Sequence, residues 1–144
     1  VGELHAADID PVAVRCARGN VGEVGGQVYV SDLYDGVPAR LRGRVDVLVV
    51  NAPYVPTDAI GLLPPEARDH EPRIALDGGV DGVEVQRRVA AGAGAWLAPG
   101  GHLLIETSAR QADRTVRAMV DGGLVARVVE DPELGATVVV GAAP

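Results

Sequence analysis

The tetrapeptide Asn51-Ala52-Pro53-Tyr54 directly follows an apolar run at residues 45–50 and combines groups suited to holding an amide. An amide nitrogen is a poor nucleophile because its lone pair is delocalised into the carbonyl. The Asn51 side-chain oxygen and the Ala52 backbone carbonyl could accept the two N–H hydrogens of such an amide and orient its nitrogen. Pro53 fixes φ, and Tyr54 can pack against a planar amide. The tetrapeptide predicts an amide clamp, with an ordinary strand-ending turn as the alternative.

Two carboxylates, Asp8 and Asp32, stand at the ends of two earlier strand-like segments, residues 1–9 and 27–33. In a doubly wound α/β domain, an acid at the end of one strand can take the ribose hydroxyls of a nucleoside. An acid at the end of the next strand can meet the adenine amine. Ordinary turn residues are the alternative for both positions, because Asp is common in turns.

Predicted strands and helices alternate along the chain. Strands are predicted at residues 1–9, 27–33, 44–50 and 102–108, helices at 10–21, 81–101 and 109–123, and two strands joined by a turn within 124–142. Asp10 and Pro11 are typical of a helix start. Alternation predicts an α/β fold with a doubly wound, mainly parallel sheet and helices on both faces. The last connection is too short for a crossover, so the last strand should be antiparallel.

The polar residues at the strand ends should lie together. Asp8, Asp32, Asn51 and Glu106 all fall at or just past the predicted carboxyl ends of strands. Because ligands bind outside these ends in open α/β sheets, we expect the four residues to converge on one rim. The loop over residues 51–82 is too long for a plain connection, and this length favours a functional role.

Composition limits the classes of function. The chain has 144 residues, 47% of them hydrophobic, and a net charge of −7, which fits one globular domain and disfavours unspecific nucleic-acid binding. The single Cys16 favours a reducing, cytoplasmic location, and we expect it to be a buried structural thiol. No apolar run is long enough for a membrane span, and no signal peptide is recognised. Three scattered histidines make a metal site unexpected.

Five stretches carry a resemblance across nearly the whole chain, and they are "ADIDPVAVRCARGN", "SDLYDGVP", "VDVLVVNAPYVP", "HEPRIALDGGVDGVEVQRRV" and "GGHLLIETSARQ". In this order and spacing the chain resembles the class I S-adenosylmethionine-dependent methyltransferases. Within them it is most similar to the HemK-type protein-(glutamine-N5) methyltransferases, which modify peptide-chain release factors. Asn-Pro-Pro-Tyr is shared with other amino methyltransferases, whereas "EPRIALDGGVDG" is more particular to the glutamine-modifying branch.

The resemblance implies S-adenosylmethionine as the cofactor and assigns its ligands. Asp8, followed by Ile9, would bind the ribose, and Asp32 with the backbone of Leu33 would meet the adenine. Asn51 would adjoin the cofactor at the acceptor site. No metal is implied.

The acceptor site is implied at residues 51–54, where Asn51, Ala52, Pro53 and Tyr54 would be the catalytic residues that hold the glutamine amide. Ala52 stands where the family has a proline. Since the useful atom there is the carbonyl, the change should be tolerated. Glu106 and Gln111 match a family strand-end pattern without an assigned role.

The chain also departs from the family in what precedes it. The first strand, the glycine-rich loop that wraps the methionine end of the cofactor and a helical recognition domain have no counterpart before Val1. We therefore expect residues 1–144 to be a partial class I methyltransferase domain with two unpaired interior strand edges. A partner chain or a swapped strand, as in a homo-oligomer, is the alternative way to fill this gap.

The function implied is transfer of a methyl group from S-adenosylmethionine to the side-chain amide nitrogen of a protein glutamine, in a release factor. One rival of the same fold methylates an amino group on a nucleic-acid base, with Tyr54 stacked on a flipped base. Another rival is a catalytically silent fragment or binding module that keeps the fold and cannot hold the cofactor. The acidic charge argues against the nucleic-acid reading, and the absent glycine-rich loop is the support for the silent one.

Overall fold

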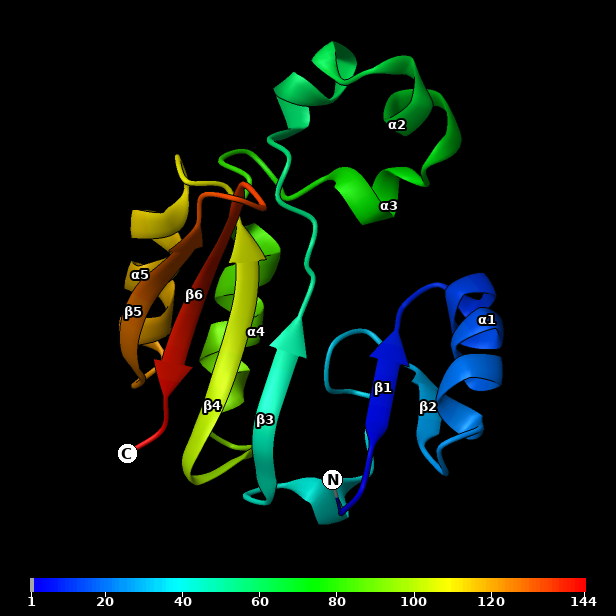
Figure 1. Cartoon of the computed structure of the whole chain (residues 1–144), viewed down its shortest axis with the longest axis vertical. Helices are drawn as coiled ribbons and strands as arrows, with labels where there is room; N and C mark the ends of the chain where they lie inside the picture. The colour runs from blue at the N-terminus through cyan, green and yellow to red at the C-terminus, as the bar shows by residue number, and fades with distance from the viewer. Residues whose placement is uncertain (1) are drawn as a thin grey trace. The chain divides into compact units, whose positions relative to one another are not determined.

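The computed structural model describes residues 2–144, which form two compact units divided between Leu41 and Arg42. The order of strands and helices is the one that the sequence predicts, with short helical turns added in the connections (Figure 1). Each unit has its own sheet. The prediction of a single partial domain over residues 1–144 is not tested by this division and stays a prediction.

The first unit is a small β-α-β arrangement. β1 (His5–Asp8) pairs with β2 (Gln27–Val30) in parallel, and α1 (Pro11–Gly22) connects them and packs on them. The predicted helix start is confirmed, since Asp10 Oδ1 accepts a hydrogen bond of 2.8 Å from the backbone N–H of Val12. This bond satisfies one of the amides that the first helical turn leaves unpaired.

The prediction of a buried Cys16 is wrong, because its side chain is exposed on α1. Val14 is the fully buried residue of this helix. Since each residue advances by about 100° around a helix, Cys16 lies about 200° from Val14 and faces away from the strands. Because the two positions lie on opposite faces, burial of Val14 against the strands leaves Cys16 exposed.

The second unit is built on a four-stranded sheet with the order β3-β4-β6-β5. The strands are β3 (Val45–Val50), β4 (Leu97–Thr107), β5 (Val125–Asp131) and β6 (Ala136–Ala142). β3 and β4 are parallel, whereas β6 runs antiparallel to both β4 and β5. The antiparallel last strand is therefore confirmed, and it lies between two strands that precede it in the chain.

α4 (Glu84–Ala93) and α5 (Ala112–Asp121) pack on each other and cover the same face of this sheet (Figure 1). The core lies between them and the strands, and its fully buried apolar side chains include Val89, Leu103, Ile105, Met119 and Val139. Helices were expected on both faces of one sheet, and within residues 42–144 they occupy one.

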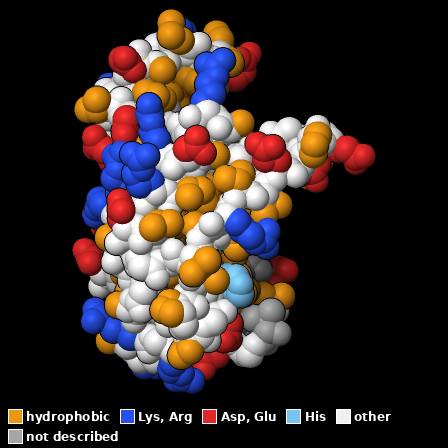
Figure 2. Space-filling view, turned by 90° about the vertical axis from the view of Figure 1, so that its left-hand side faces the viewer, with side chains coloured by type: hydrophobic (Ala, Val, Ile, Leu, Met, Phe, Trp, Pro, Cys, Tyr) orange, Lys and Arg blue, Asp and Glu red, His pale blue; other side chains and the backbone are white. Residues whose placement is uncertain are grey.

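The other face of the second sheet carries apolar side chains that stay exposed, among them Val47, Val49 and Val125. Register explains the difference between the two faces of β3. Leu48 and Val50 pair with the buried Leu103 and Ile105, whereas the alternating valines point to the opposite side. Figure 2, which views the side carrying α5 and β5, likewise shows hydrophobic side chains between charged ones on the surface.

In the part of the chain that the structure describes, β1 and β3 each have one side without a partner strand in their own sheets. Among residues 2–144, β1 pairs only with β2, and β3 pairs within its sheet only with β4. That these two edges flank one gap inside a single sheet, as expected from the sequence, stays a prediction, since the strands belong to different compact units. An unpaired edge presents free N–H and C=O groups to any strand that can dock there.

The remaining segments are short helical turns. η1 (Ala39–Leu41) precedes β3, and the connection from β3 to α4 contains η2 (Thr57–Leu62), α2 (Pro65–His70) and α3 (Arg73–Leu76). Each of the last three begins after a proline, which cannot donate to a preceding carbonyl but suits a helix start. None of the helices described in residues 2–144 has the length and apolarity needed to cross a bilayer.

The packing of α5 on the sheet can be tested at Met119, which is fully buried. Met119→Ala should lower the free energy of unfolding by about 2–5 kcal/mol, because it leaves a cavity against the sheet. Val120→Ala in the same helix is the control, and its side chain is 54% exposed. Urea denaturation should show a change within about 0.5 kcal/mol for the control. Equal losses in both variants would mean that α5 is packed differently.

Candidate functional site

The predicted acceptor residues leave the carboxyl end of β3. Asn51 is exposed immediately after the strand, and its side-chain amide makes no hydrogen bond within residues 2–144. Ala52 is buried, while Pro53 and Tyr54 are half-buried. The Asn51 side chain is therefore accessible to a ligand, and its role in an amide clamp stays a prediction.

The backbone after the tetrapeptide is tied to a second segment. Val55 donates its N–H to the carbonyl of Leu76 at 3.0 Å, and Gly78 donates to the carbonyl of Val55 at 2.8 Å. Thr57 continues the pattern by donating to the carbonyl of Gly79 at 3.0 Å. These bonds make a short parallel bridge that holds residues 51–57 against the turn before α4.

Asp77 closes this turn with its side chain. Its carboxylate accepts hydrogen bonds from Thr57 Oγ1 at 2.6 Å, from the N–H of Gly79 at 3.1 Å and from Arg73 Nε at 3.2 Å. The Thr57 hydroxyl contributes most to lowering the pKa of Asp77, followed by the Gly79 amide. All three donors favour the charged carboxylate.

Gln111 reaches the tetrapeptide from the opposite direction. It stands just before α5, is only 7% exposed, and donates from Nε2 to the carbonyl of Tyr54 at 2.8 Å. No role for Gln111 follows from the sequence, because nothing in its local pattern shows that it contacts a residue 57 positions earlier. Glu106 is exposed near the end of β4, and the pairing of Val50 with Ile105 brings it to the same sheet edge as Asn51.

The predicted ribose ligand stands at the end of β1. Asp8 is exposed, and its Oδ1 accepts the backbone N–H of Asp10 at 2.8 Å. The other carboxylate oxygen has no hydrogen bond within the described residues, which leaves it available to a hydroxyl. Ile9, at the same turn, is 42% exposed.

The turn after β2 holds a residue in an unusual conformation. Leu33 has φ +50, which a residue with a side chain rarely adopts. Ser31 stabilises this turn, since its buried hydroxyl donates to the carbonyl of Leu33 at 2.8 Å and accepts the N–H of Gly36 at 2.7 Å. Such strained backbone is concentrated at functional sites. Ser31 could not be singled out from the sequence, because a serine after a strand is also an ordinary turn residue.

The four residues expected on one rim lie in two pairs, one pair in each compact unit. Asp8 and Asp32 lie at the carboxyl ends of the parallel strands β1 and β2, and Asn51 and Glu106 lie at those of β3 and β4. Convergence of all four on one rim stays a prediction, since the two pairs belong to different compact units. Within residues 2–144 no group of three or more His, Cys, Asp and Glu side chains could hold a metal ion.

Curated relatives match most of this chain in sequence. The release factor glutamine methyltransferase of Cereibacter sphaeroides is 38% identical over 133 residues, which are 90% of this chain and 46% of that protein. The release factor glutamine methyltransferase of Moorella thermoacetica is 42% identical over 109 residues, 75% of this chain and 38% of that protein. The chain thus spans less than half the length of these relatives. No family model matches it.

A third relative is named for a different acceptor. The ribosomal protein uL3 glutamine methyltransferase of Bordetella pertussis is 38% identical over 110 residues, which are 74% of this chain and 36% of that protein. All three relatives are therefore named as glutamine methyltransferases, and their names differ in the protein that is modified.

Solved structures share the fold. A methyltransferase from Pyrococcus furiosus superposes with a TM-score of 0.66 and 13% identity, covering 97% of this chain and 62% of that one. The N-methyltransferase NodS from Bradyrhizobium japonicum, in complex with S-adenosyl-L-homocysteine, gives a TM-score of 0.57 and 14% identity over 99% of this chain and 67% of that one. The α/β fold with a mainly parallel sheet is thus that of the class I methyltransferases.

The hydrogen bonds around Asp77 predict a titration that NMR can follow. Because the pKa of Asp77 lies below its ordinary value of about 3.9, its carboxylate stabilises the folded protein above that pH. This stabilisation is lost as the pH falls through the folded pKa. Thr57→Val should raise the midpoint of the Asp77 carboxyl carbon titration, since the hydroxyl is the largest single cause of the lowered pKa. An unchanged midpoint in Thr57→Val would contradict this account.

Proposed function

Because the chain belongs by sequence to the release factor glutamine methyltransferase family, we propose that it forms part of an enzyme that methylates a protein glutamine. The methyl group would be transferred from S-adenosylmethionine to the side-chain amide nitrogen. The observation that carries this proposal is the tetrapeptide at residues 51–54, where an exposed, unpartnered Asn51 amide follows directly on a strand end.

The acceptor residues would orient the glutamine amide. Asn51 Oδ1 and the Ala52 carbonyl would each accept one N–H hydrogen of the substrate, which directs the nitrogen toward the methyl group. Tyr54 would pack against the plane of the amide, and Pro53 would keep the backbone in its extended turn. Formation of the C–N bond with breakage of the C–S bond would leave a neutral thioether, and the amide proton that is lost would pass to solvent. A site of dipoles suits this step better than a charged site.

The cofactor residues fit an adenosine group. Bound S-adenosylmethionine supplies an electrophilic methyl group on a sulfonium. The oxygen of Asp8 that lacks a partner suits a ribose hydroxyl, with Ile9 beside it. Asp32 and the strained backbone of Leu33 suit the adenine edge, and Ser31 fixes that backbone. Asn51 would border the methyl group from the acceptor side.

A peptide-chain release factor is the acceptor that we propose, because two of the relatives described above are named for it. A ribosomal protein is the second candidate, favoured by the name of the relative from Bordetella pertussis. Both acceptors belong to translation, so we also propose a cytoplasmic location. Assay of the complete protein that contains this chain with both acceptors and with nucleic acid, using tritiated methyl groups, would separate these candidates. Label appearing only in nucleic acid would refute the glutamine assignment.

The acceptor role of Asn51 can be separated from cofactor binding. In the complete protein, Asn51→Ala should lower kcat by about 100-fold or more, since it removes one of the two orienting acceptors. The Kd for S-adenosylmethionine, measured by calorimetry, should change by less than about 3-fold. Asn20→Ala, which removes an exposed asparagine from α1, is the matched control and should leave both quantities unchanged. Loss of cofactor binding in Asn51→Ala would place Asn51 outside the acceptor site.

Asp8 and Asp10 provide a pair of neighbouring acids with different roles. Asp8→Ala should raise the Kd for S-adenosylmethionine by about 10- to 100-fold, because a charge-assisted hydrogen bond to the ribose is lost. Asp10→Ala should instead lower stability by about 1 kcal/mol through loss of the helix cap, with the Kd changed by less than about 3-fold. Calorimetry and urea denaturation measure the two effects. A reversal of this pattern would show that Asp8 serves the turn alone.

A further inference from the structure

We propose that Gln111 is a positioning residue for methyl transfer, which holds the backbone of residues 51–54 in the orientation that the glutamine acceptor needs. The inference rests on the proposed function, because it assigns a role within the same acceptor site. Gln111 would not touch the substrate or the cofactor. It acts through the carbonyl of Tyr54, to which its side chain donates a hydrogen bond of 2.8 Å.

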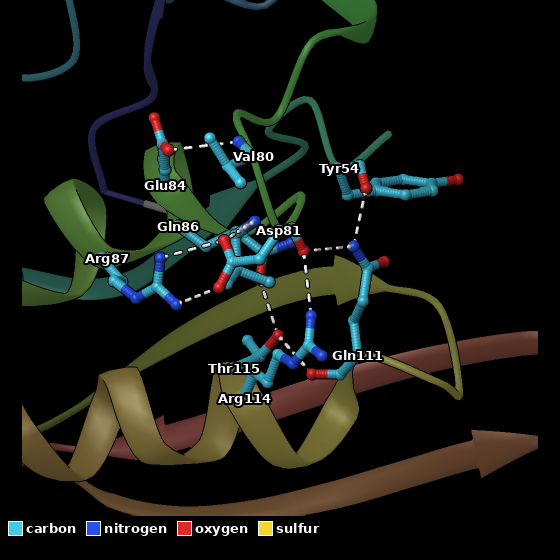
Figure 3. A network of polar contacts seen from close by, with 10 residues as sticks. Tyr54, Val80, Asp81, Glu84, Gln86, Arg87, Gln111, Arg114 and Thr115 are labelled. Carbon is cyan, nitrogen blue, oxygen red and sulfur yellow. Dashed lines mark hydrogen bonds and ion pairs between the residues drawn. The ribbon is translucent and has the colours of Figure 1, made fainter. Parts of the chain in front are cut away.

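The side chain of Gln111 connects three segments that are distant in sequence. From its place before α5 it points toward the end of the tetrapeptide and toward the turn before α4 (Figure 3). Its Nε2 donates to the carbonyl of Tyr54 and, at 3.3 Å, to the carbonyl of Asp81. One amide group therefore fixes two backbone carbonyls against each other.

A glutamine is the side chain that this position requires. Its amide offers two N–H donors for the two carbonyls, and its Oε1 accepts the hydroxyl of Ser108 at 2.6 Å. At 7% exposure the side chain has little access to water, so a carbonyl that lost its donor would stay poorly solvated. Glutamate has the same shape and no N–H, and it would present oxygen to both carbonyls.

The residue is supported from below by a buried polar cluster. The Thr115 hydroxyl donates to Gln86 Oε1 at 2.6 Å, and its oxygen also lies 3.3 Å from the carbonyl oxygen of Gln111. Gln86 and Thr115 are fully buried, and Thr107 on β4 completes the cluster. These bonds join α4, α5 and β4. They fix the position of the start of α5, from which the Gln111 side chain extends.

Gly82 allows the close approach of the turn. It has φ +77, and a Cβ added there would overlap both the Gln111 amide and the Tyr54 carbonyl. A residue with a side chain would therefore be strained in its backbone and would also displace the donor. The turn around Gly82 and the Gln111 side chain are therefore packed against each other and against the carbonyl of Tyr54.

Displacement of this turn and of Gln111 should change the orientation of the acceptor amide. It should leave the affinity for the cofactor unchanged. The Tyr54 carbonyl is two residues from the Ala52 carbonyl that is proposed to accept the substrate N–H. A shift of the acceptor by about 1 Å can lower the rate about 100-fold, because transfer depends on alignment. The proposed ribose and adenine ligands belong to the other compact unit, which has its own sheet.

Gln111→Glu in the complete protein is the test. It should lower kcat for methylation of a release-factor glutamine by about 10- to 100-fold and change the Kd for S-adenosylmethionine by less than about 3-fold. Hydrogen exchange of the Val55 and Gly78 amides, which form the bridge to the tetrapeptide, should become about 10-fold faster or more. Exchange within α5 should stay unchanged.

Met119→Ala is the matched control, because it destabilises the same helix without touching the polar contacts of Gln111. Its kcat should stay within about 2-fold of the parent at a temperature where both proteins are folded. Unchanged exchange of the Val55 and Gly78 amides in Gln111→Glu, or an equal fall of kcat in Met119→Ala, would overturn the proposal. If the parent protein methylates no glutamine, the proposed function fails, and amide exchange alone decides the role of Gln111.

Discussion

The parallel pairing of β3 with β4 is the constraint on which the candidate acceptor site depends. It places Val50 beside Ile105, so the two strands end at the same edge of the sheet. Asn51 and the start of α5 consequently leave the sheet side by side in the second unit. The hydrogen bond from Gln111 to the carbonyl of Tyr54 can form only because these two exits are neighbours. A shift in the pairing would separate the tetrapeptide from Gln111 and break this hydrogen bond.

Two carboxylates in the turn that is bonded to residues 54–57, those of Asp77 and Asp81, have local hydrogen-bond partners. The Arg87 guanidinium is the main cause of the lowered pKa of Asp81, and its Nη1 donates to the Asp81 carboxylate at 3.0 Å. Asp77 is held by a hydroxyl, an amide and Arg73. Asn51 itself is uncharged, and in the proposed reaction a dipolar acceptor suits a step in which a cationic group loses its charge.

In the small first unit, polar side chains bond to the backbone of residues close to them in sequence. The caps and turns after β1 and β2 use short polar side chains that bond within a few residues, namely Asp8, Asp10 and Ser31. Such local bonds can hold the unusual conformation of Leu33 without a large core. The proposed nucleoside ligands are thus supported by turn geometry, whereas the proposed acceptor residues are supported by long-range contacts.

The sequence alone determined the order of elements, the helix start at Asp10, the antiparallel last strand and the family, because these follow from periodicity, turn chemistry and local motifs. Tertiary structure decided what depends on contacts between distant segments. Only the fold shows that Cys16 is exposed, that α4 and α5 share one face, and that Gln111 meets Tyr54. The physical reason is that local patterns fix backbone conformation, whereas burial and long-range hydrogen bonds depend on how strands pair and helices pack.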